Sequence, residues 1–322
     1  MREIEIGVNQ CGQRLDKFLH KYMKEAPTSF LYKMLRKKNI KLNGKKADGK
    51  EKLVEGDVVT LYFSEETLEK FCGKQPPFAI TDKCTSHVSL DVVYEDSHVV
   101  CINKPAGMLS QKAKESDVSL VEHFVAYAGS AEIGFTPGIC NRLDRNTSGL
   151  VIGGKTLLGL QKMSELIHDR NVRKYYLAIV HGEMKSRGIV EGYLTKDEAT
   201  NTVSVEPKER PGSSYIKTGY EALASDGNYT LVKVQLFTGK THQIRSHLAS
   251  ISHPIVGDVK YGGKRTKAIR RQLLHAYELH FPELEAPFEG LSNGRVIAPV
   301  PKDFYGEEAI RRLMEHLESL RK

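Results

Sequence analysis

Two stretches near the N-terminus repeat hydrophobic residues at the spacing of one helix face. They run from Gln13 to Met23 and from Ser29 to Lys38, with apolar positions at Leu15, Phe18, Leu19, Tyr22, Phe30, Leu31, Met34 and Leu35. Pro27-Thr28-Ser29 supplies a break and a cap between them. A strand from Ile40 then enters an Asn-Gly turn, and residues 58–63 are expected to be the closing strand. Two helices and a small sheet are therefore predicted for residues 1–64.

From residue 88 the pattern changes to short β-branched runs that alternate with helical stretches. Strands are expected at 91–94, 98–103, 150–152, 176–180, 188–194, 215–223 and 229–236, and helices at 119–128, 157–169 and 306–320. Strands outnumber helices and follow one another through short turns, which predicts an α+β domain with a largely antiparallel mixed sheet over residues 88–322. Residues 65–87 have weak periodicity and contain Gly73, Pro76 and Pro77, so they are expected to form a linker.

Positive charge is concentrated in the first predicted domain. The chain of 322 residues has a net charge of +8. Residues 1–64 hold 14 Lys and Arg against 8 Asp and Glu, which accounts for six of those eight net charges. This asymmetry indicates a polyanion-binding module joined to a nearly balanced body.

The composition argues against several classes of protein. No window of about 18 uncharged apolar residues occurs and the N-terminus lacks an apolar signal core, so we expect no membrane span and a cytoplasmic location. The five cysteines are scattered without C-x-x-C spacing, which argues against a disulfide framework and against zinc. His242, His247 and His253 lack the spacing that aligns two ligands on one helix face, so no metal is expected.

Residues 149–156 match the phosphate-loop pattern G-x-x-x-x-G-K-T literally. A true phosphate loop needs a buried strand before its first glycine and open amides that wrap the phosphate. Here the polar residues 145–148 come first, and the supposed loop contains Leu150-Val151-Ile152, which is expected to be the strand itself. A nucleotide site is therefore not expected, and Ser148 lacks the G-x-S-x-G pattern of a serine nucleophile.

The candidate chemistry is centred on Asp144, which lies between Arg142 and Arg145 just before the strand at 150–152. A carboxylate between arginines is usually a surface ion pair, so the interpretation depends on the motifs that accompany it. These motifs are residues 91–107, 173–178, 238–248, 253–262 and 274–276. Arg142 and Arg145, or Arg245 from the motif at 238–248, would favour the ionised form of Asp144, ready to act as nucleophile or base.

Residues 1–64 resemble the S4 RNA-binding domain in their R-L-D-K-F-L opening, their basic second helix and their I-K-L-N-G-K turn. The resemblance implies RNA contact through the basic side chains of this module, which are Lys33, Arg36, Lys37, Lys38, Lys41 and Lys45. The alternative for such a basic helix is a solvated surface without a ligand.

From about residue 90 to the C-terminus, the motifs resemble those of the RluA-type pseudouridine synthases and follow the same order. These enzymes isomerise uridine in RNA to its C-glycoside. The resemblance implies Asp144 as the catalytic carboxylate, and Arg245 is a further candidate catalytic residue. It implies that Tyr176 stacks on the target base and assists deprotonation at C5, and that Arg142 fills the gap left by the flipped nucleotide. It leaves open whether Asp144 attacks C1′ or removes a ribose proton.

Two positions depart from the family pattern, with Asn141 in place of the usual His and Lys240 in place of Arg. The isomerisation involves no net redox change or group transfer, so no cofactor is expected. A structured RNA is the expected partner of a monomeric enzyme, with 23S ribosomal RNA as the first expectation and transfer RNA as the second. The alternative is a non-catalytic RNA-binding or ribosome-assembly protein, which would not need Asp144.

Overall fold

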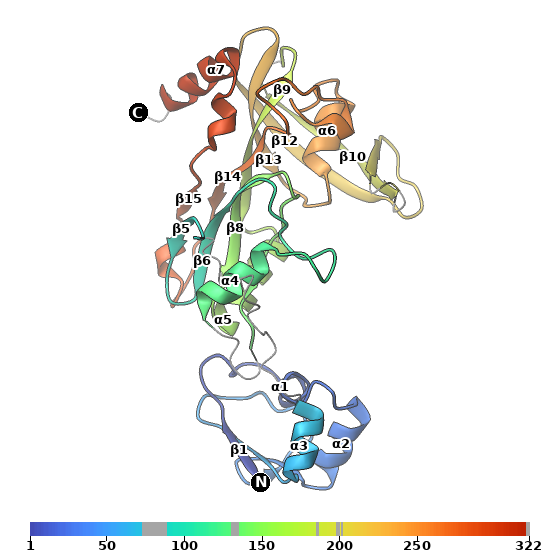
Figure 1. Ribbon diagram of the computed structural model, residues 1–322, viewed down its shortest axis with the longest axis vertical. Coiled ribbons are helices and arrows are strands. Elements are labelled where there is room, and N and C mark those ends of the chain that lie inside the picture. The colour runs from blue at the N-terminus through green and yellow to red at the C-terminus, as the bar shows by residue number, and fades with distance from the viewer. Residues whose placement is uncertain (73–88, 130–134, 185–186, 198–199, 201, 320–322) are drawn as a thin grey trace.

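The computed structural model describes residues 1–72, 89–129, 135–184, 187–197, 200 and 202–319 (Figure 1). Residues 73–87 of the expected linker and the expected start of the second domain at residue 88 lie outside this part of the chain.

The N-terminal domain is a small antiparallel sheet packed with helices. Its elements are β1 (Arg2–Glu5), α1 (Leu15–Tyr22), α2 (Thr28–Arg36), β2 (Ile40–Leu42), β3 (Lys45–Lys46), β4 (Val58–Leu61) and α3 (Glu65–Cys72), with the sheet order β1-β4-β2-β3. The predicted helix faces are confirmed, because Leu15, Phe18, Leu19, Leu31 and Leu35 are buried in one core. The amphipathic pattern is what fixes both helices against the sheet.

Two details of this domain correct the sequence prediction. Asn43 and Gly44 have positive φ angles, as a tight hairpin turn requires, but the strand that closes the hairpin is β3, and β4 pairs with the other side of β2. The expected linker begins with a helix, since α3 occupies residues 65–72 and buries Leu68 in the core of the domain. A helix with one buried residue leaves too weak a periodic signal for prediction.

An 11-stranded mixed sheet forms the centre of the second domain. Its strands are β5 (Val92–Glu95), β6 (Val99–Lys104), β7 (Gly138–Ile139), β8 (Ser148–Gly154), β9 (Arg173–His181), β10 (Arg187–Asp197), β11 (Thr202–Glu206), β12 (Ser214–Ser225), β13 (Tyr229–Leu236), β14 (Leu274–His280) and β15 (Arg295–Ile297). The order is β11-β10-β12-β13-β9-β14-β8-β6-β5, with β7 beside β8 and β15 beside β14. Among the described strands only β14 and β8 pair in parallel, so the predicted largely antiparallel α+β architecture is confirmed.

Helices pack around both halves of this sheet (Figure 1). α4 (Leu120–Ala128) lies near β7 and α5 (Leu157–His168) near β8, whereas α6 (Gln243–Ser250) lies near β10, β11 and β12, and α7 (Glu308–Ser319) near β12 and β13. Three short 3-10 helices are η1 (Val259–Tyr261), η2 (Glu289–Leu291) and η3 (Lys302–Tyr305). In the described part of the chain, no helix combines the length and apolar character that crossing a membrane would need.

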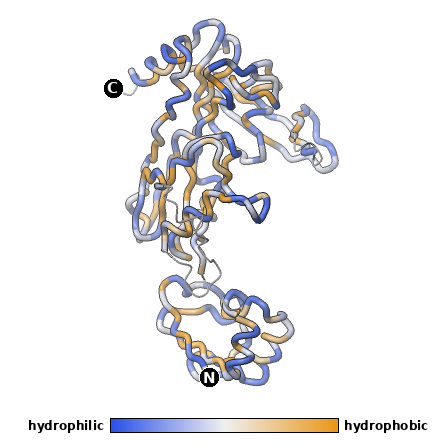
Figure 2. The backbone as a smooth tube through the Cα atoms, in the orientation of Figure 1, coloured by the Kyte–Doolittle hydropathy of each residue, from blue (hydrophilic) through white to orange (hydrophobic). Residues whose placement is uncertain are grey.

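Strand β9 separates two hydrophobic cores. Tyr176 belongs to a cluster that includes Leu248 of α6, whereas Leu177 and Ile179 belong to a cluster that includes Leu313 of α7. Successive side chains of a strand point to opposite faces, which explains this division. Figure 2 shows the hydrophobic residues concentrated along the central strands. The alternation therefore directs Tyr176 towards α6 and away from α7.

The stretch that matches the phosphate-loop pattern is a buried strand. Every residue of β8 is buried, and residues 149–154 pair with β6. Gly149 has a φ angle of 111°, and a Cβ atom at this position would lie 2.1 Å from the carbonyl oxygen of Ala276. The prediction of a strand in place of a nucleotide loop is confirmed, and the glycine is explained by the close approach of β14.

Candidate active site

Asp144 lies in the loop between β7 and β8, at the side of a cleft with a volume of about 680 Å³. The cleft is also lined by the loop after β6, by β9 and by the start of α6. Four residues predicted for the site line it together: Arg142, Asp144, Tyr176 and Arg245. Asp144 and Arg245 are 101 residues apart in sequence, so the fold creates this proximity.

Arg245 bridges two carboxylates. Its Nε and Nη2 atoms donate to the two oxygens of Asp258, each at 2.7 Å, and its Nη1 donates to Asp144 Oδ2 at 3.0 Å. The Asp144 side chain is 25% exposed, whereas that of Asp258 is 1% exposed. Burial lowers the pKa of Arg245, but hydrogen bonding and charge from Asp258, then from Asp144, outweigh burial and raise this pKa above its usual value. The bidentate contact fixes a charged guanidinium in one orientation, in which its third nitrogen, Nη1, faces Asp144.

The two arginines that flank Asp144 in the sequence make other contacts. Arg142 is exposed and donates to Gln111 Oε1 at 3.4 Å, while Arg145 Nε donates to the carbonyl oxygen of Gly107 at 3.1 Å. Of the three candidate arginines, Arg245 is therefore the one whose hydrogen bond to Asp144 the structure shows. The exposed position of Arg142 on the cleft suits contact with RNA.

Tyr176 is 7% exposed and occupies the middle of β9, opposite Ala276 of β14. It lines the same cleft as Asp144. Burial raises the pKa of its hydroxyl, and the negative charge of Asp144 adds to this effect. The hydroxyl is therefore uncharged at neutral pH, so it is suited to donate a hydrogen bond or pass a proton and is not a preformed phenolate base.

The loop that carries Asp144 is fastened on both sides of that residue. Ser110 Oγ donates to the carbonyl oxygen of Leu143 at 2.8 Å and accepts the Leu143 amide at 3.0 Å. The Gly107 amide donates to the carbonyl oxygen of Arg145 at 2.8 Å. Lys104 Nζ also donates to this oxygen, at 3.2 Å, while its other two bonds go to backbone carbonyls of the loop after β6. Burial lowers the pKa of Lys104 to about 7, with Arg271 adding to the effect and Asp144 opposing it.

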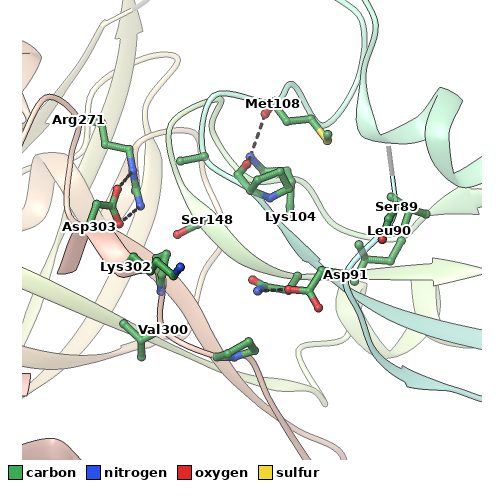
Figure 3. A pocket seen from close by; sticks show the side chains of 16 residues that line it. Ser89, Leu90, Asp91, Lys104, Met108, Ser148, Arg271, Val300, Lys302 and Asp303 are labelled. Atoms are coloured by element: carbon green, nitrogen blue, oxygen red, sulfur yellow. Dashed lines mark hydrogen bonds and ion pairs between the residues drawn. The ribbon is translucent and has the colours of Figure 1, made fainter. Parts of the chain in front are cut away.

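A second cavity of about 520 Å³ is lined by Lys104, Ser148 and Arg271 (Figure 3). Arg271 donates to the carbonyl oxygen of Asn146 at 3.0 Å and is held by Asp303, whose Oδ1 accepts Nη2 at 2.7 Å. Ser148 Oγ is hydrogen-bonded to His275 Nδ1 at 2.9 Å. These contacts extend the fastening of the Asp144 loop to its junction with β8.

Asn141 shows how the chain accommodates its departure from the family pattern. Its amide nitrogen donates to the carbonyl oxygen of Leu150 at 3.2 Å, and its amide oxygen accepts the Ile152 amide at 2.8 Å. The side chain thus satisfies two backbone groups of β8 and ties the Asp144 loop to that strand. Lys240, the other departure, lines the cleft, and its backbone amide donates to Gln243 Oε1 at 3.1 Å.

The basic residues predicted to contact RNA lie on α2, β2, β3 and the turn between α2 and β2 of the N-terminal domain. Lys33, Arg36, Lys37, Lys38 and Lys45 are exposed, and Lys41 is half-buried. Lys41 Nζ lies 5.0 Å from the ring centroid of Tyr62, which is 43% exposed. A group of exposed cations, one of them beside an exposed ring, is typical of a surface that contacts phosphates and bases.

Three residues around the Asp144–Arg245 pair were not singled out by the sequence: Asp258, His242 and Tyr261. Asp258 orients Arg245, as described above. His242 Nε2 lies 3.8 Å from Asp144 Oδ2, and the Tyr261 ring centroid lies 5.0 Å from the Cζ atom of Arg245. All three belong to the motifs 238–248 and 253–262. The order of these motifs carried the family resemblance, but it did not indicate which of their side chains lie near Asp144.

Comparison with protein families gives two matches, which cover separate parts of the chain. Residues 98–250 match the model described as RNA pseudouridylate synthase, and residues 13–59 match the S4 domain. Over 297 residues the chain is 32% identical to ribosomal large subunit pseudouridine synthase C of Vibrio vulnificus, with 89% of this chain and 90% of that protein covered. It is 29% identical to ribosomal large subunit pseudouridine synthase D of Escherichia coli, with 92% and 90% covered.

A solved structure named Human RNA Pseudouridylate Synthase Domain Containing 4 has a related fold. It matches with a TM-score of 0.54 and covers 71% of this chain and 92% of the human chain. At 24% sequence identity this likeness concerns the fold alone.

Proposed function

Because the chain belongs to the RluA-type RNA pseudouridine synthases with an N-terminal S4 domain, we propose that it converts uridine to pseudouridine in large-subunit ribosomal RNA, with Asp144 as its catalytic carboxylate. The single observation that carries the role of Asp144 is its ion pair with the buried Arg245 inside the cleft. The names of the relatives from Vibrio vulnificus and Escherichia coli support ribosomal RNA as the substrate.

The chemistry of the isomerisation explains why an ionised carboxylate is needed. The bond between N1 of uracil and C1′ of ribose breaks, the base turns, C5 joins C1′, and C5 then loses its proton. An ionised carboxylate beside the ribose can act as nucleophile or base in this sequence. The fastening of the loop by Ser110 and Lys104 supports the proposal, because a fixed carboxylate needs little reorganisation to reach the reacting atoms.

The target uridine has to leave its stack to enter this cleft. An exposed Arg142 at the cleft is suited to occupy the space that the flipped nucleotide vacates, and the ring of Tyr176 is suited to stack on the uracil. The lining of one cleft by Arg142, Tyr176 and Asp144 supports these roles.

Replacement of Tyr176 by Phe tests whether its hydroxyl takes part in the chemistry. We expect turnover at saturating RNA to fall by about tenfold, as the loss of one hydrogen bond in the transition state would cause, while RNA affinity changes by less than about twofold because the ring remains. Single-turnover rates and RNA binding measured on the same preparations check this. Unchanged rate and unchanged affinity would instead assign Tyr176 a purely stacking role.

The S4 domain is proposed to supply salt-sensitive RNA affinity. Substitution of Arg36 and Lys37 by Gln in the full chain should weaken RNA binding and make the dependence of log affinity on log salt shallower, by up to about 0.9 for each phosphate that is no longer neutralised. The matched control replaces Arg311 and Arg312, two equally exposed cations on α7, by Gln. If both double variants give the wild-type slope, the basic surface of α2 does not contact RNA.

A pseudouridine map of cellular RNA tests the proposed substrate. In a strain that lacks this protein, specific uridines of large-subunit ribosomal RNA should remain unmodified, and the wild-type gene should restore them. A gene that carries Asp144→Asn should not. An unchanged ribosomal map together with lost modification of transfer RNA would contradict the proposed substrate and leave the reaction class intact.

A further inference from the structure

His242 is placed towards the cleft by an unusual backbone conformation. It precedes the first residue of α6 and has a φ angle of 55°, in the left-handed region that residues with a Cβ atom seldom adopt. Its side chain is 10% exposed, and its Nε2 atom lies 3.8 Å from Asp144 Oδ2. Strained backbone of this kind persists where the surrounding structure fixes it, and such positions are concentrated at functional sites.

Tyr261 determines which nitrogen of His242 carries the proton. Its hydroxyl is 2.9 Å from His242 Nδ1 and accepts the backbone amide of Val203 on β11 at 3.1 Å. Of these two partners, only Nδ1 can offer a lone pair to the hydroxyl hydrogen. With the hydroxyl hydrogen directed to Nδ1, the single proton of the neutral imidazole resides on Nε2, the atom that faces Asp144.

We propose that His242 is a positioning residue that presents its Nε2–H group to the Asp144 carboxylate as a second donor beside Arg245, and that Tyr261 holds His242 in this tautomer. The inference deepens the proposed function and rests on the catalytic role of Asp144. Two donors from different side chains restrict the rotation of a carboxylate more than one donor does. The separation of 3.8 Å is less than about 1 Å beyond hydrogen-bond length, and such contacts commonly shorten when substrate closes a site.

The charges around His242 favour the neutral imidazole, the form in which the tautomer decides whether Nε2 carries a proton. Burial lowers the pKa of His242 below its usual value. Asp144 and Asp258 oppose this effect, while Arg245 and Lys260 reinforce it. Tyr261 adds a hydroxyl donor to Nδ1, which stabilises the neutral form further. The imidazole is therefore uncharged at pH 7 and has one N–H group to donate.

The experiment compares the full-length protein with its Tyr261→Phe variant, which keeps a ring against Arg245 and removes only the hydroxyl. Turnover on RNA at saturating concentration is measured across pH, and nitrogen-15 spectra of histidine-labelled protein report the tautomer of His242. His242→Gln identifies the His242 signals among the 12 histidines. We expect Tyr261→Phe to lower turnover by about tenfold with RNA affinity unchanged. The Nε2–H tautomer should lose population, and the loss of turnover relative to the wild type should shrink as the pH falls, because the imidazolium carries a proton on Nε2 whichever tautomer the neutral ring prefers.

The conservative variant His242→Gln provides the matched test, because its side-chain amide can also donate towards Asp144, whereas His242→Leu cannot. Turnover of His242→Gln should exceed that of His242→Leu, and adding Tyr261→Phe to His242→Gln should not add a pH-dependent loss of turnover, because no tautomer remains for Tyr261 to hold. An unchanged tautomer, together with a turnover in Tyr261→Phe that matches the wild type at every pH, would overturn the proposal. The spectra do not depend on activity, so a failure of the Asp144 assignment would be recognised separately, by substantial turnover in Asp144→Asn.

Discussion

Replacement of Asp144 by Asn is expected to abolish pseudouridine formation, with turnover at least about 10³-fold below that of the wild type. The substitution removes the charge that either assignment of Asp144 needs and changes the side-chain volume very little. The amide oxygen can still accept the hydrogen bond from Arg245, so the cleft should keep its shape. Release of tritium from RNA that carries tritium at C5 of uridine measures the reaction directly, because C5 loses its hydrogen when pseudouridine forms.

Two measurements show whether that loss is specific to the chemistry. RNA affinity and the urea midpoint of unfolding should both remain near their wild-type values, since Asp144 is partly exposed and the buried Arg245 keeps its ion pair with Asp258. Turnover within tenfold of wild type would remove Asp144 from the catalytic role.

Replacement of Arg245 by Met is expected to cost both activity and stability. Asp258 would lose both of its hydrogen bonds from Arg245 while remaining buried, and an unpaired buried charge costs about 3–5 kcal/mol in the free energy of unfolding. Asp144 would lose its partner at the same time, so we expect turnover to fall by at least about 10²-fold. Urea unfolding and single-turnover kinetics measure the two effects.

The double variant Arg245→Met/Asp258→Leu separates the two roles of this arginine. It removes the stranded carboxylate together with the guanidinium, and an apolar replacement of a buried ion pair is often close to neutral in stability. Much of the lost unfolding free energy should therefore return, while turnover stays low because Asp144 still lacks its donor. Recovery of activity together with stability would mean that Arg245 serves the fold and not the reaction.

The sequence predicted elements whose apolar residues repeat at regular spacing. Helices α1, α2, α4, α5 and α7 and most long strands occur where that repeat occurs, because one apolar face packs on one core. β14 was missed although it lies in the middle of the sheet. Its buried Glu278 is paired with Lys233 from β13, 2.8 Å away. Glu278 is neutralised by a residue 45 positions away in the sequence, so its immediate neighbours look like those of an exposed glutamate and do not indicate that it is buried.

Helix α6 escaped prediction for a related reason. Gln243, Arg245, Ser246 and His247 are all buried, and hydrogen bonds hold them in place of apolar packing. His247 Nδ1, for example, is 2.7 Å from Thr218 Oγ1 on β12. Ile244 and Leu248 are the only apolar residues among the six buried in this helix, which is too few for a hydrophobic period to indicate it.

The candidate site shows the same division between local and long-range information. The run around Asp144 indicated a reactive carboxylate, but three arginines were equally eligible as its partner from sequence alone. Arg245 is the partner of Asp144 because Asp258, in a segment beyond α6, accepts two hydrogen bonds from its guanidinium and fixes its orientation. The contacts among Asp144, Arg245 and Asp258 form only in the folded chain, so the sequence pattern could not indicate them.

The short parallel pairing of β8 with β14 joins two sections of the second domain, through the pairs Ser148–His275 and Gly149–Ala276. Asp144 comes from the section that contains β8, whereas Arg245 and Tyr176 come from the section that contains β9 to β13. Neither section holds the complete set of proposed catalytic groups. A nascent or partly unfolded chain that has formed one section alone has Asp144 without Arg245, or Arg245 without Asp144. We therefore expect the chain to modify RNA only after both sections have folded and paired.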